Sequence, residues 1–560
     1  MAALLKIEDL SVDFLAEKDV LNAVKHINLE VNKGQIVALV GESGSGKSVT
    51  SLSILQLLPS PPAQYSSGKI WFTENEKSVD LLTFNANSLQ EIRGKKISMI
   101  FQEPMTSLNP VMSCGRQVME ALLVHYNIAR EEAKRRAIEW FRKVQLPDPE
   151  DMFNRYPHQL SGGQKQRVMI SMAMCCEPSL LICDEPTTAL DVTVQKEILN
   201  LIKELQQQQN MGVIFITHDL GVVAEIADRV AIMYQGEIVE QGDAEKIFSA
   251  PHHPYTKALI ACRPALHPRE ERLPIVSDYM SGKTETKDEK LLRAVTPKGK
   301  IFVKVENLVV QFPSKKNFLG KTLGNFTAVN NVSFEIYKNE TLGLVGESGC
   351  GKTTIGRTLL RLVEPTSGKI LFKNEDITSL GNKDLKLLRK DIQLVFQDPY
   401  SSLNPRLTIG TAIAEPMAIA GIESNSKARR KRVGELLEMV NLSAGMINRY
   451  PHEFSGGQRQ RIVIARALGL HPDFLVCDES VSALDVSVQA QVLNLLNDLK
   501  NRLGLTMLFI SHDLSVVRYM CDRIMVMEKG KIVETGSSED IYMNPKTEYT
   551  RKLLSAIPAI

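Results

Sequence analysis

The octapeptide GESGSGKS at Gly41–Ser48 occurs a second time in the chain, as GESGCGKT at Gly346–Thr353. A short apolar run precedes each copy, QIVALV or TLGLV, and a segment of helical character follows, SVTSLSILQLL or TTIGRTLLRLV. A glycine-rich loop between a buried strand and a helix, ending in Lys and a hydroxyl residue, is the pattern of a phosphate-binding P-loop. The sequence therefore predicts an α/β protein with two tandem P-loop domains.

Other motifs repeat in the same register. SGGQKQR and SGGQRQR, CDEPTTALDV and CDESVSALDV, and THDL and SHDL are each 294 residues apart. The segments FQEPMTSLNP and FQDPYSSLNP are 295 apart, whereas the P-loops are 305 apart. The chain is therefore a duplication, with about ten extra residues in the first copy. We expect them at LPSPPAQYSS, which starts at Leu58, because its prolines end a helix.

Length and composition agree with two soluble domains. The chain has 560 residues, and a single hydrophobic core stops growing near roughly 250 to 300 residues. Apolar residues make up 43% and charged residues 24%, and the net charge of +2 disfavours a nucleic-acid partner. No apolar run is long enough to cross a bilayer, and the acidic N-terminal stretch does not resemble a signal peptide. We expect a cytoplasmic protein whose contact with a membrane is indirect.

The predicted organisation is a first domain over residues 1–270, a linker over 271–300 and a second domain over 301–560. The stretch 271–300 is charged, poor in aromatic residues and interrupted by Pro and Gly, as linkers are. A solvated excursion of the first domain is the alternative. The eight cysteines lack paired spacing and lie mostly among apolar residues, so we expect buried reduced thiols rather than disulfides or zinc ligands.

The P-loops supply the predicted nucleotide contacts. Backbone N–H groups of such a loop surround phosphate oxygens, its Lys places a charge at the outer phosphates, and its final hydroxyl can ligate magnesium. Val49 stands where the second copy has Thr354, so one hydroxyl is missing from the first site. The predicted contacts are Gly41, Glu42, Ser43, Gly44, Ser45, Gly46, Lys47, Ser48 and Val49, and Gly346, Glu347, Ser348, Gly349, Cys350, Gly351, Lys352, Thr353 and Thr354.

Two acids and a histidine follow apolar runs in each half. LLICDE ends in Asp184 and Glu185, and FLVCDE ends in Asp478 and Glu479. If this strand lies beside the P-loop strand, the Asp reaches the magnesium and the Glu polarises the attacking water. The second copy has Ser480 in place of a proline after the acids, and we expect a change in turn stiffness only. His218 and His512 each follow the Glu by 33 residues, which favours a phosphate-sensing or water-positioning role over a structural one.

The SGGQ segments begin amphipathic helices and predict anion contacts at helix N-termini. A simple helix cap would explain the Ser but not the two glycines, each of which costs about 1 kcal/mol inside a helix. The predicted contacts are Ser161, Gly162, Gly163 and Gln164 in the first copy and Ser455, Gly456, Gly457 and Gln458 in the second.

The order of P-loop, glutamine motif, SGGQ, Asp-Glu, ALD and His-Asp resembles the nucleotide-binding subunits of ABC transporters, over nearly the whole chain twice. The resemblance implies ATPase domains, each with a mixed sheet core and a helical subdomain, paired head to tail as an intramolecular pseudo-dimer. Each ATP then lies between one P-loop and the SGGQ segment of the other domain. ATP and Mg²⁺ are the implied cofactors.

Further residues match this family's motifs. Gln102 and Gln397 match the glutamine that links magnesium and nucleotide to the membrane partner, and Asp191 and Asp485 match aspartates that cross the dimer interface. Phe14 and Phe312 stand where an aromatic stacks on adenine, an ordinary strand aromatic being the alternative. The implied catalytic residues are Glu185, Glu479, His218, His512, Gln102 and Gln397, and the implied magnesium ligands are Ser48, Gln102, Asp184, Thr353, Gln397 and Asp478.

The repeated SLNP segment and the tail PHHPYTKALI, with its echo PKTEYTRKLL, look like the oligopeptide and dipeptide permease subfamily. The fused arrangement is similar to single-chain versions that serve peptide, microcin or glutathione importers. This implies two permease subunits, an extracytoplasmic solute-binding protein and a peripheral position on the cytoplasmic face of the inner membrane. Many relatives carry a cysteine cluster after HPYT, whereas this chain has only Cys262 there, so we expect no iron–sulfur cluster.

The leading hypothesis is an energy-coupling ATPase of a peptide importer. The alternative is a soluble twin-cassette ATPase acting on ribosomes or DNA. Proteins of that kind usually carry a long charged helical linker or zinc-type cysteine pairs, and they lack SLNP. Export is a third possibility. The sequence identifies no residue that would contact a transported solute, because we expect the solute-binding protein and the permeases to recognise it, so peptide, nickel, glutathione and other small solutes stay open.

Overall fold

The computed structural model describes residues 3–15, 20–102, 107–187, 190–269, 271–282, 299–316, 322–423 and 425–557. Internal contacts divide the chain between Ile260 and Ala261 into two compact units. The division predicted at residue 270 lies ten residues further along the chain. Parts of three predicted features lie outside the described residues: 103–106 of the segment FQEPMTSLNP, 188–189 of the segment CDEPTTALDV, and 283–298 of the linker.

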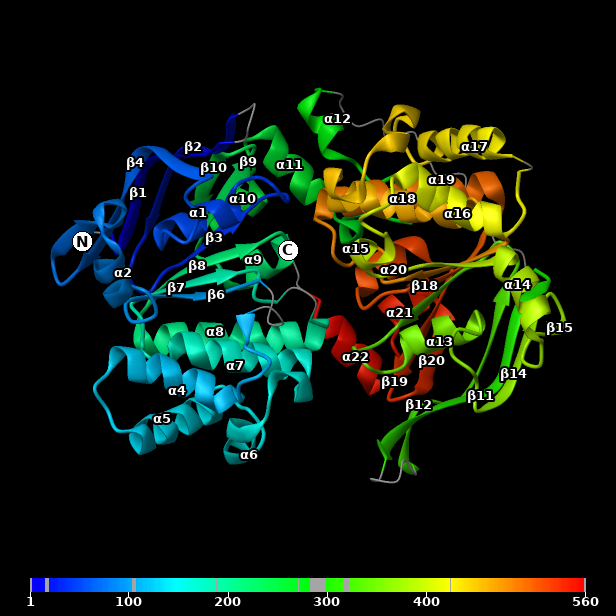
Figure 1. Cartoon of the computed structure of the whole chain (residues 1–560), viewed down its shortest axis with the longest axis horizontal. Coiled ribbons are helices and arrows are strands. Elements are labelled where there is room, and N and C mark those ends of the chain that lie inside the picture. Colours follow the sequence, from blue (N-terminus) through cyan, green and yellow to red (C-terminus); the bar gives the residue numbers. More distant parts are fainter. Residues whose placement is uncertain are drawn as a thin grey trace. The chain divides into compact units, whose positions relative to one another are not determined.

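The first unit contains two sheets and a layer of helices (Figure 1). The antiparallel sheet has the order β2-β1-β4-β5, with β1 Leu5–Leu15, β2 Val20–Val31, β4 Ala63–Glu74 and β5 Lys77–Asp80. The second sheet has the order β10-β9-β3-β8-β7-β6, with β3 Ile36–Val40, β6 Ile97–Ile100, β7 Leu180–Asp184, β8 Gly212–Thr217, β9 Arg229–Tyr234 and β10 Glu237–Asp243. Its strands are parallel except for β10, which is antiparallel to β9.

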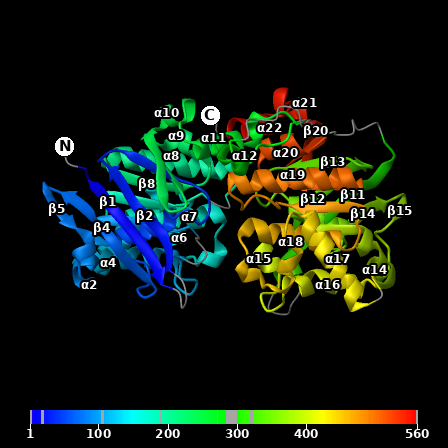
Figure 2. The ribbon, with the colours of Figure 1, turned by 90° about the horizontal axis from the view of Figure 1, so that it is seen from above.

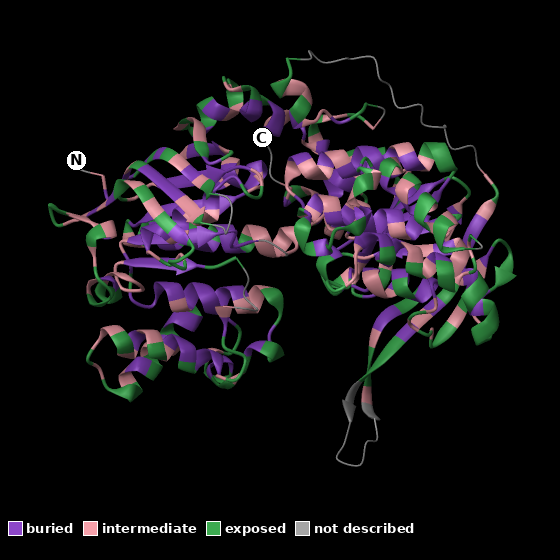
Figure 3. Ribbon diagram, turned by 45° about the horizontal axis from the view of Figure 1, so that its top comes forward, coloured by how far each residue is buried: buried purple, intermediate pink, exposed green. Residues whose placement is uncertain are grey.

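Two apolar cores enclose the six-stranded sheet of the first unit. Along β7, Leu181 and Cys183 belong to the core shared with the helical layer, and Leu180 and Ile182 belong to the core shared with the antiparallel sheet. Because successive side chains of a strand point to opposite faces, a strand buried on both faces is apolar throughout. This explains the continuous apolar runs of the sequence. Figure 3 shows these strands as buried.

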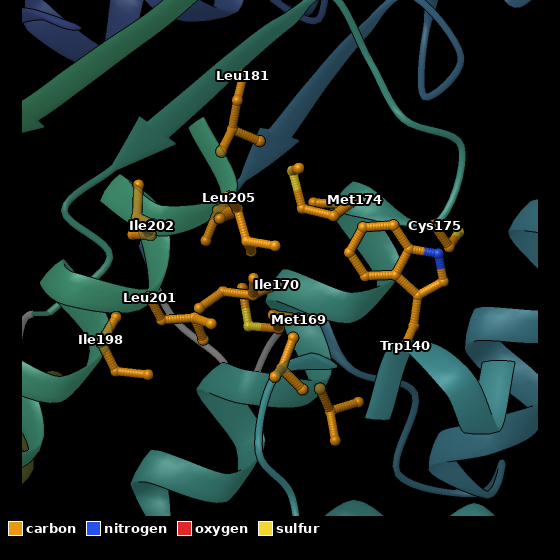
Figure 4. Close-up of a cluster of buried hydrophobic side chains, with 14 of the residues drawn as sticks. Trp140, Met169, Ile170, Met174, Cys175, Leu181, Ile198, Leu201, Ile202 and Leu205 are labelled. Atoms are coloured by element: carbon orange, nitrogen blue, oxygen red, sulfur yellow. The ribbon is translucent and has the colours of Figure 1, made fainter. Parts of the chain in front are cut away.

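The helical layer of the first unit packs through large apolar side chains. Trp140 belongs to one buried cluster with Met169, Ile170 and Met174 and with side chains of α8, including Leu205 (Figure 4). The helices are α1 Lys47–Ile54, α2 Ala86–Ile92, α4 Cys114–His125, α5 Arg130–Lys143, α6 Pro149–Asn154, α7 Gly162–Met174, α8 Val192–Gln209, α9 Leu220–Ile226, α10 Ala244–Ser249 and α11 Pro254–Ala261. Short 3₁₀ helices cover Leu81–Thr83 and Pro157–Gln159.

The second unit repeats this architecture. Its sheets have the orders β12-β11-β14-β15 and β16-β17-β18-β13-β19-β20. The strands are β11 Ile301–Lys316, β12 Thr322–Tyr337, β13 Thr341–Val345, β14 Ser367–Phe372, β15 Glu375–Asp376, β16 Ile392–Val395, β17 Phe474–Asp478, β18 Thr506–Ile510, β19 Arg523–Glu528 and β20 Lys531–Ser537. The α/β fold with a mixed sheet and a helical subdomain in each half is therefore confirmed.

In the second unit, α15 to α18 form a helical layer beside α19 (Figure 2). The helices are α12 Val276–Met280, α13 Lys352–Leu359, α14 Asn382–Asp391, α15 Pro399–Ser402, α16 Ile409–Ile419, α17 Ser426–Met439, α18 Gly456–Leu468, α19 Val486–Leu503, α20 Leu514–Met520, α21 Ser538–Met543 and α22 Glu548–Ser555. Short 3₁₀ helices cover Pro264–Leu266, Ala444–Asn448 and Pro451–Glu453.

The extra residues of the first copy are divided between two places. Gly68 and Gly368 occupy the same turn, with φ of 99° and 98°, and are 300 residues apart. The offset therefore falls from 305 to 300 before this turn, in the region of LPSPPAQYSS, and from 300 to 295 after it. The second step accompanies a longer hairpin, because β5 has four residues and β15 has two.

The segment around Leu273 packs on the second unit rather than extending into solvent. The Asn494 side chain donates to the Leu273 carbonyl at 2.8 Å and accepts from the Leu273 N–H at 3.1 Å. Tyr519 Oη donates to the Glu271 carbonyl at 2.9 Å. The described start of the predicted linker, residues 271–282, is thus attached to α19 and α20. The segment uses backbone groups for these three bonds, so its polar composition could not predict them.

All eight cysteines are buried and none of them forms a disulfide, so the prediction of reduced buried thiols is confirmed. Among the described residues, none of the helices combines the length and the apolar character needed to cross a bilayer.

Candidate functional site

The P-loop of each unit joins the central strand of the parallel sheet to the helix that follows. In the first unit β3 leads into the loop and α1 begins at Lys47, with Gly46 as its N-cap at φ of 104°. The side chain of a capping residue usually occupies the first N–H groups of a helix, and a glycine cap has none to offer. Gly351 caps α13 at φ of 111° in the same way. Both loops therefore present uncapped helix N-termini, which suit phosphate.

The loop is also shaped by close backbone approaches. A Cβ at Gly41 would lie 2.2 Å from the Met233 carbonyl oxygen, and one at Gly346 would lie 2.2 Å from that of Met527. Only glycine allows the loop to rest on the neighbouring strand in this manner. By contrast, nothing lies within 4 Å of a Cβ built at Gly44, whose φ of 82° explains the glycine instead.

The P-loop lysines are buried and bridge the loop. Lys47 is 6% exposed, and its Nζ donates to the carbonyl oxygens of Gly41 at 2.7 Å and Glu42 at 2.9 Å. Lys352 makes the same two bonds to Gly346 and Glu347, at 2.7 and 2.9 Å. Each ammonium thus lies inside its loop, where the predicted charge for the outer phosphates is needed.

The hydroxyl after each lysine meets the predicted magnesium aspartate. Ser48 Oγ lies 3.2 Å from Asp184 Oδ1, and Thr353 Oγ1 lies 3.0 Å from Asp478 Oδ1. The prediction that the acid-bearing strand is the neighbour of the P-loop strand is wrong, since β8 lies between β3 and β7 and β18 lies between β13 and β17. The pairing still forms because the helix after the loop crosses the intervening strand and contacts the strand that ends in the acid.

Burial perturbs the two aspartates. Asp184 is 6% exposed, and burial raises its pKa to about 6, although the Ser48 hydrogen bond opposes the rise. Burial raises the pKa of Asp478 as well, against the Thr353 hydrogen bond. A divalent cation bound between this carboxylate and the hydroxyl would stabilise the charged form of the aspartate, because it compensates for the hydration that the carboxylate loses on burial.

The predicted catalytic glutamate of the first unit lies between two polar side chains. Gln102 Nε2 donates to Glu185 Oε2 at 2.9 Å, and His218 Nδ1 lies 3.2 Å from Glu185 Oε1. The carboxyl ends of β6, β7 and β8 place these three residues together. Glutamine and histidine thus hold one carboxylate from two sides.

The second unit repeats this cluster. Gln397 Nε2 donates to Glu479 Oε2 at 2.6 Å, and His512 Nδ1 lies 3.6 Å from the same oxygen. Burial alone would raise the pKa of Glu479, but His512 and Lys352 hold it below its usual value. Burial lowers the pKa of His512 and the Glu479 carboxylate more than restores it, so the net shift is upward. The pair therefore favours a carboxylate beside a protonated imidazole.

Both glutamates have left-handed backbone conformations, with φ of 47° at Glu185 and 46° at Glu479. Their N–H groups donate to the carbonyls of Ile216 and Ile510, each at 2.9 Å. Such a conformation is uncommon for residues other than glycine and persists where the surroundings hold it. It occurs at the same position of both units, directly where the strand ends.

The SGGQ segments form capping boxes. Ser161 Oγ accepts from the Gln164 N–H at 3.3 Å, and Gln164 Oε1 accepts from the Ser161 N–H at 3.1 Å. Ser455 and Gln458 make the equivalent bonds. The predicted helix starts are confirmed as α7 and α18, whose first residues are the first glycines of the motif.

Packing explains one glycine of each pair. A Cβ at Gly163 would lie 2.7 Å from Val194 Cγ1, and one at Gly457 would lie 2.1 Å from Val488 Cγ1. The second glycine therefore lets α7 approach α8, and α18 approach α19. Around the first glycine the unit leaves ordinary space, with 3.6 Å from a Gly162 Cβ to Leu190. Steric contact within the unit does not require it.

Two other sets of predicted residues occupy distinct positions. Asp191 caps α8 by accepting from the Val194 N–H at 3.1 Å, and Asp485 is the residue before α19. Phe14 pairs with Leu21 on β2 and packs on the apolar core, and Phe312 pairs with Phe326 on β12 and is 39% exposed.

In each unit the C-terminal tail is hydrogen-bonded to the P-loop, a contact that the sequence did not predict. The Glu42 N–H donates to Tyr255 Oη at 3.1 Å, and the Glu347 N–H donates to Tyr549 Oη at 3.0 Å. The only sequence signal was the Tyr-Thr pair that survives in both PHHPYTKALI and PKTEYTRKLL.

The residues present fit a magnesium nucleotide. Each P-loop offers an uncapped helix N-terminus and a buried lysine, and a hydroxyl–aspartate pair adjoins it. Ser48, Asp184 and Gln102, or Thr353, Asp478 and Gln397, supply the oxygen ligands that Mg²⁺ prefers. A bound Mg²⁺ would neutralise charge on the outer phosphates.

Two family models match the sequence. The model of the ABC transporter matches residues 24–188 and 329–482, and that of the oligopeptide/dipeptide transporter C-terminal region matches residues 239–288 and 533–560. The chain belongs to the ABC transporter family and is an ATP-binding, ATP-hydrolysing member with two fused cassettes.

Curated relatives are similar over nearly the full length. The chain is 48% identical to the glutathione import ATP-binding protein GsiA of Escherichia coli (strain K12), over 99% of this chain and 89% of that protein. The GsiA protein of Salmonella paratyphi A shows the same identity and coverage. Among solved structures, a dimeric ATP-binding cassette in a post-hydrolysis state bound to ADP and Pi is 29% identical, with a TM-score of 0.39, over 42% of this chain and 98% of that one.

Proposed function

We propose that this protein is the energy-coupling ATPase of an ABC importer for small peptides, with glutathione, itself a tripeptide, as the first candidate. The observation that carries the ATPase part is the cluster of Gln, Glu and His beside a P-loop in both units. The observation that carries the substrate class is the match to the oligopeptide/dipeptide transporter region in both halves, together with full-length relatives named for glutathione import.

In the proposed reaction Glu185 and Glu479 each polarise the water that attacks the terminal phosphate. His218 and His512 orient the glutamate and contact the phosphate, while Lys47 and Lys352 stabilise its charge. Gln102 and Gln397 join the glutamate to the metal side of the site. All these groups come from the carboxyl ends of neighbouring strands and from the P-loop.

The nucleotide contacts are proposed to be completed between the units. Ser161–Gln164 of one cassette faces the P-loop that ends in Thr353, and Ser455–Gln458 faces the P-loop that ends in Ser48. Phe14 and Phe312 stack on adenine. In support, the carbonyl of Ala23, close to the β2 partner of Phe14, lies 2.7 Å from a Cβ built at Gly46.

ATP closes the two cassettes, closure acts on two transmembrane permease subunits, and hydrolysis resets them. A solute-binding protein outside the membrane delivers the substrate, and the ATPase lies on the cytoplasmic face of the inner membrane. The extents 1–270 and 301–560 for the cassettes, and the absence of an iron–sulfur cluster, remain predictions. The alternative function on ribosomes or DNA is not favoured, because it leaves the match to the transporter C-terminal region unexplained.

The test combines uptake with ATP turnover. A strain that lacks this gene is complemented with the wild type or with Glu185→Gln/Glu479→Gln, and uptake of labelled glutathione, a dipeptide and a nickel salt is measured. We expect the wild type to restore glutathione or dipeptide uptake and the double variant to restore neither. Turnover of ATP by the purified double variant should fall by about 100-fold or more, since a positioned general base contributes roughly 10²–10⁴-fold.

Two results would contradict the proposal. Undiminished ATP turnover in the double variant would remove both glutamates from catalysis. Restored nickel uptake without peptide uptake would overturn the substrate class, and stable co-sedimentation with ribosomes would overturn the importer itself.

A further inference from the structure

The C-terminal tail of each unit is built onto the start of its P-loop. Tyr255, the second residue of α11, has a fully buried side chain, and its hydroxyl accepts from the Glu42 N–H. Tyr549, the second residue of α22, accepts from the Glu347 N–H. The two tyrosines are 294 residues apart, like the other repeated motifs.

The same P-loop residue also holds the lysine. Glu42 presents its N–H to Tyr255 and its carbonyl to Lys47 Nζ, at 2.9 Å. Glu347 does so with Tyr549 and Lys352, also at 2.9 Å to the lysine. The N–H and the carbonyl of Glu42 belong to the two planar peptide groups that flank its Cα. Because each of these groups is held by a hydrogen bond, the φ and ψ of Glu42 are restricted together. The tyrosine therefore helps to set where the lysine ammonium lies.

The residues directly before each tyrosine-bearing helix are hydrogen-bonded to the edge strand of the sheet. Glu240 on β10 accepts from the N–H groups of His252 and His253, at 2.8 and 3.1 Å, directly before α11. Glu534 on β20 accepts from the N–H groups of Lys546 and Thr547, at 2.8 and 3.1 Å, directly before α22. A carboxylate, half-buried at Glu240 and buried at Glu534, thus fastens the start of each helix to the edge strand, although the sequence before the tyrosine differs between the copies.

Ring packing at Tyr255 and burial at Tyr549 further restrict the two tyrosines. The Tyr255 ring packs on Tyr234 with centroids 4.3 Å apart, and Tyr234 follows Met233, whose carbonyl touches the P-loop glycine Gly41. In the second unit, burial raises the pKa of the Tyr549 hydroxyl, so it stays protonated and can donate as well as accept. Loop, edge strand and tail therefore form one packed group.

We propose that Tyr255 and Tyr549 are positioning residues of the two ATP sites, through which the transporter C-terminal region sets the affinity of the P-loop for nucleotide. The proposal rests on the nucleotide role of the P-loops described under the proposed function. It gives a physical task to the Tyr-Thr pair, which is retained in both tails while the preceding His-Pro is not.

The test uses the full chain with Tyr255→Phe, Tyr549→Phe and the double substitution. Phenylalanine keeps the ring and removes the hydroxyl that the P-loop N–H needs. We expect the double variant to raise the KM for ATP about two- to tenfold, as the loss of one hydrogen bond at a binding site does, and to change kcat less than twofold. Hydrogen exchange of the P-loop peptides should become at least fivefold faster.

Tyr126→Phe is the matched control. Tyr126 Oη donates to the Cys176 carbonyl at 3.1 Å in the helical layer, so this change also removes a tyrosine bond to backbone but leaves the P-loop alone. Its KM and its P-loop exchange should equal those of the wild type. A shift of KM as large as in the double variant would show a general loss of structure and would overturn the proposal.

Two further outcomes separate the proposal from its premise. Unchanged KM and unchanged P-loop exchange in the double variant would overturn the positioning role, even if Lys47→Ala/Lys352→Ala abolishes nucleotide binding. If that lysine variant binds ATP normally, the nucleotide role of the P-loops fails as well. Should the double variant be poorly folded, the single variants and hydrogen exchange at each loop decide the same question site by site.

Discussion

At the scale of single residues, the two ATP sites differ at the position directly after the P-loop motif. Val49 follows the P-loop of the first site and packs on the apolar core of its unit, whereas Thr354 stands at the equivalent place of the second. The bonds from the P-loop lysine to two loop carbonyls, and the distance from the hydroxyl to the aspartate, agree within 0.2 Å between the sites. We therefore expect two competent sites of unequal affinity.

Thr354→Val should weaken nucleotide binding at the second site and make the sites more alike. The loss of one hydrogen bond costs about 0.5 to 1.5 kcal/mol, which is roughly two- to tenfold in affinity. Titration calorimetry with MgATP in the Glu185→Gln/Glu479→Gln background resolves both sites. Val49→Thr is the reciprocal control and should tighten the first site. Equal affinities before the change would contradict a role for this hydroxyl.

At the scale of elements, the close approach of two helices in each unit depends on a glycine, which has no side chain. Gly457 lets α18 approach α19 at Val488, and Gly163 does the same for α7 and α8 at Val194. Gly456 has more room, since Leu484 is the nearest atom at 3.9 Å from a Cβ built there. The two glycines of the motif therefore serve different ends: close helix packing requires the second, and our proposal assigns the first to nucleotide contact.

Gly457→Ala should destabilise the protein, and Gly456→Ala should not. The Cβ at position 457 would overlap Val488, and overpacking costs about 1–3 kcal/mol. Urea unfolding measures this loss, and a second substitution, Val488→Ala, should recover part of it by removing the atoms that clash. Gly456→Ala should keep the free energy of unfolding while lowering ATP turnover. Equal stability losses at both positions would contradict the division of roles.

At the scale of the whole molecule, residues 261–282 are part of the second unit although they follow the tail of the first. Asp522, whose side chain is 9% exposed, accepts from the Thr341 N–H at 2.7 Å and from Lys500 Nζ at 3.0 Å, and Arg269 pairs with its other oxygen. Burial would raise the pKa of Asp522, but Lys500 and Arg269 hold it below the usual value. In the first unit the equivalent Asp228 binds the Ile36 N–H at 2.7 Å.

Arg269→Ala should destabilise the second unit at neutral pH and raise the pKa of Asp522. A hydrogen bond to a charged group contributes about 1.5–3 kcal/mol. Because the folded pKa of Asp522 is depressed, its contribution is present above its unfolded pKa of about 3.9 and is lost as the pH falls through the folded pKa. The difference between wild type and variant should thus persist at pH 5–7 and shrink below about pH 4.

Urea unfolding across pH 3.5–7 measures this difference, and Arg272→Ala is the control on the same segment. Arg272 pairs with Asp498 at 3.0 Å, but both side chains are about 40% exposed, so we expect a change of only about 0–1 kcal/mol. Equal effects of the two substitutions, or a difference that does not depend on pH, would contradict the buried pairing.

The sequence by itself determined the duplication, the motif set of each cassette and the family. These are properties of residue type and spacing: a P-loop needs its glycines and lysine in order, and a strand buried on both faces must be apolar throughout. Hence Lys47, Asp184, Glu185 and His218 could be named, and the helix that begins at SGGQ could be placed.

Only the tertiary structure decided how distant segments meet. The strand that ends in Asp184 is separated from the P-loop strand by β8, the start of the predicted linker packs on α19, and Tyr255 reaches the P-loop from more than 200 residues away. Local spacing carries no information about which of several parallel strands are neighbours, nor about which backbone N–H a buried hydroxyl will satisfy. Those choices follow from burying both faces of each sheet while most buried polar groups find partners.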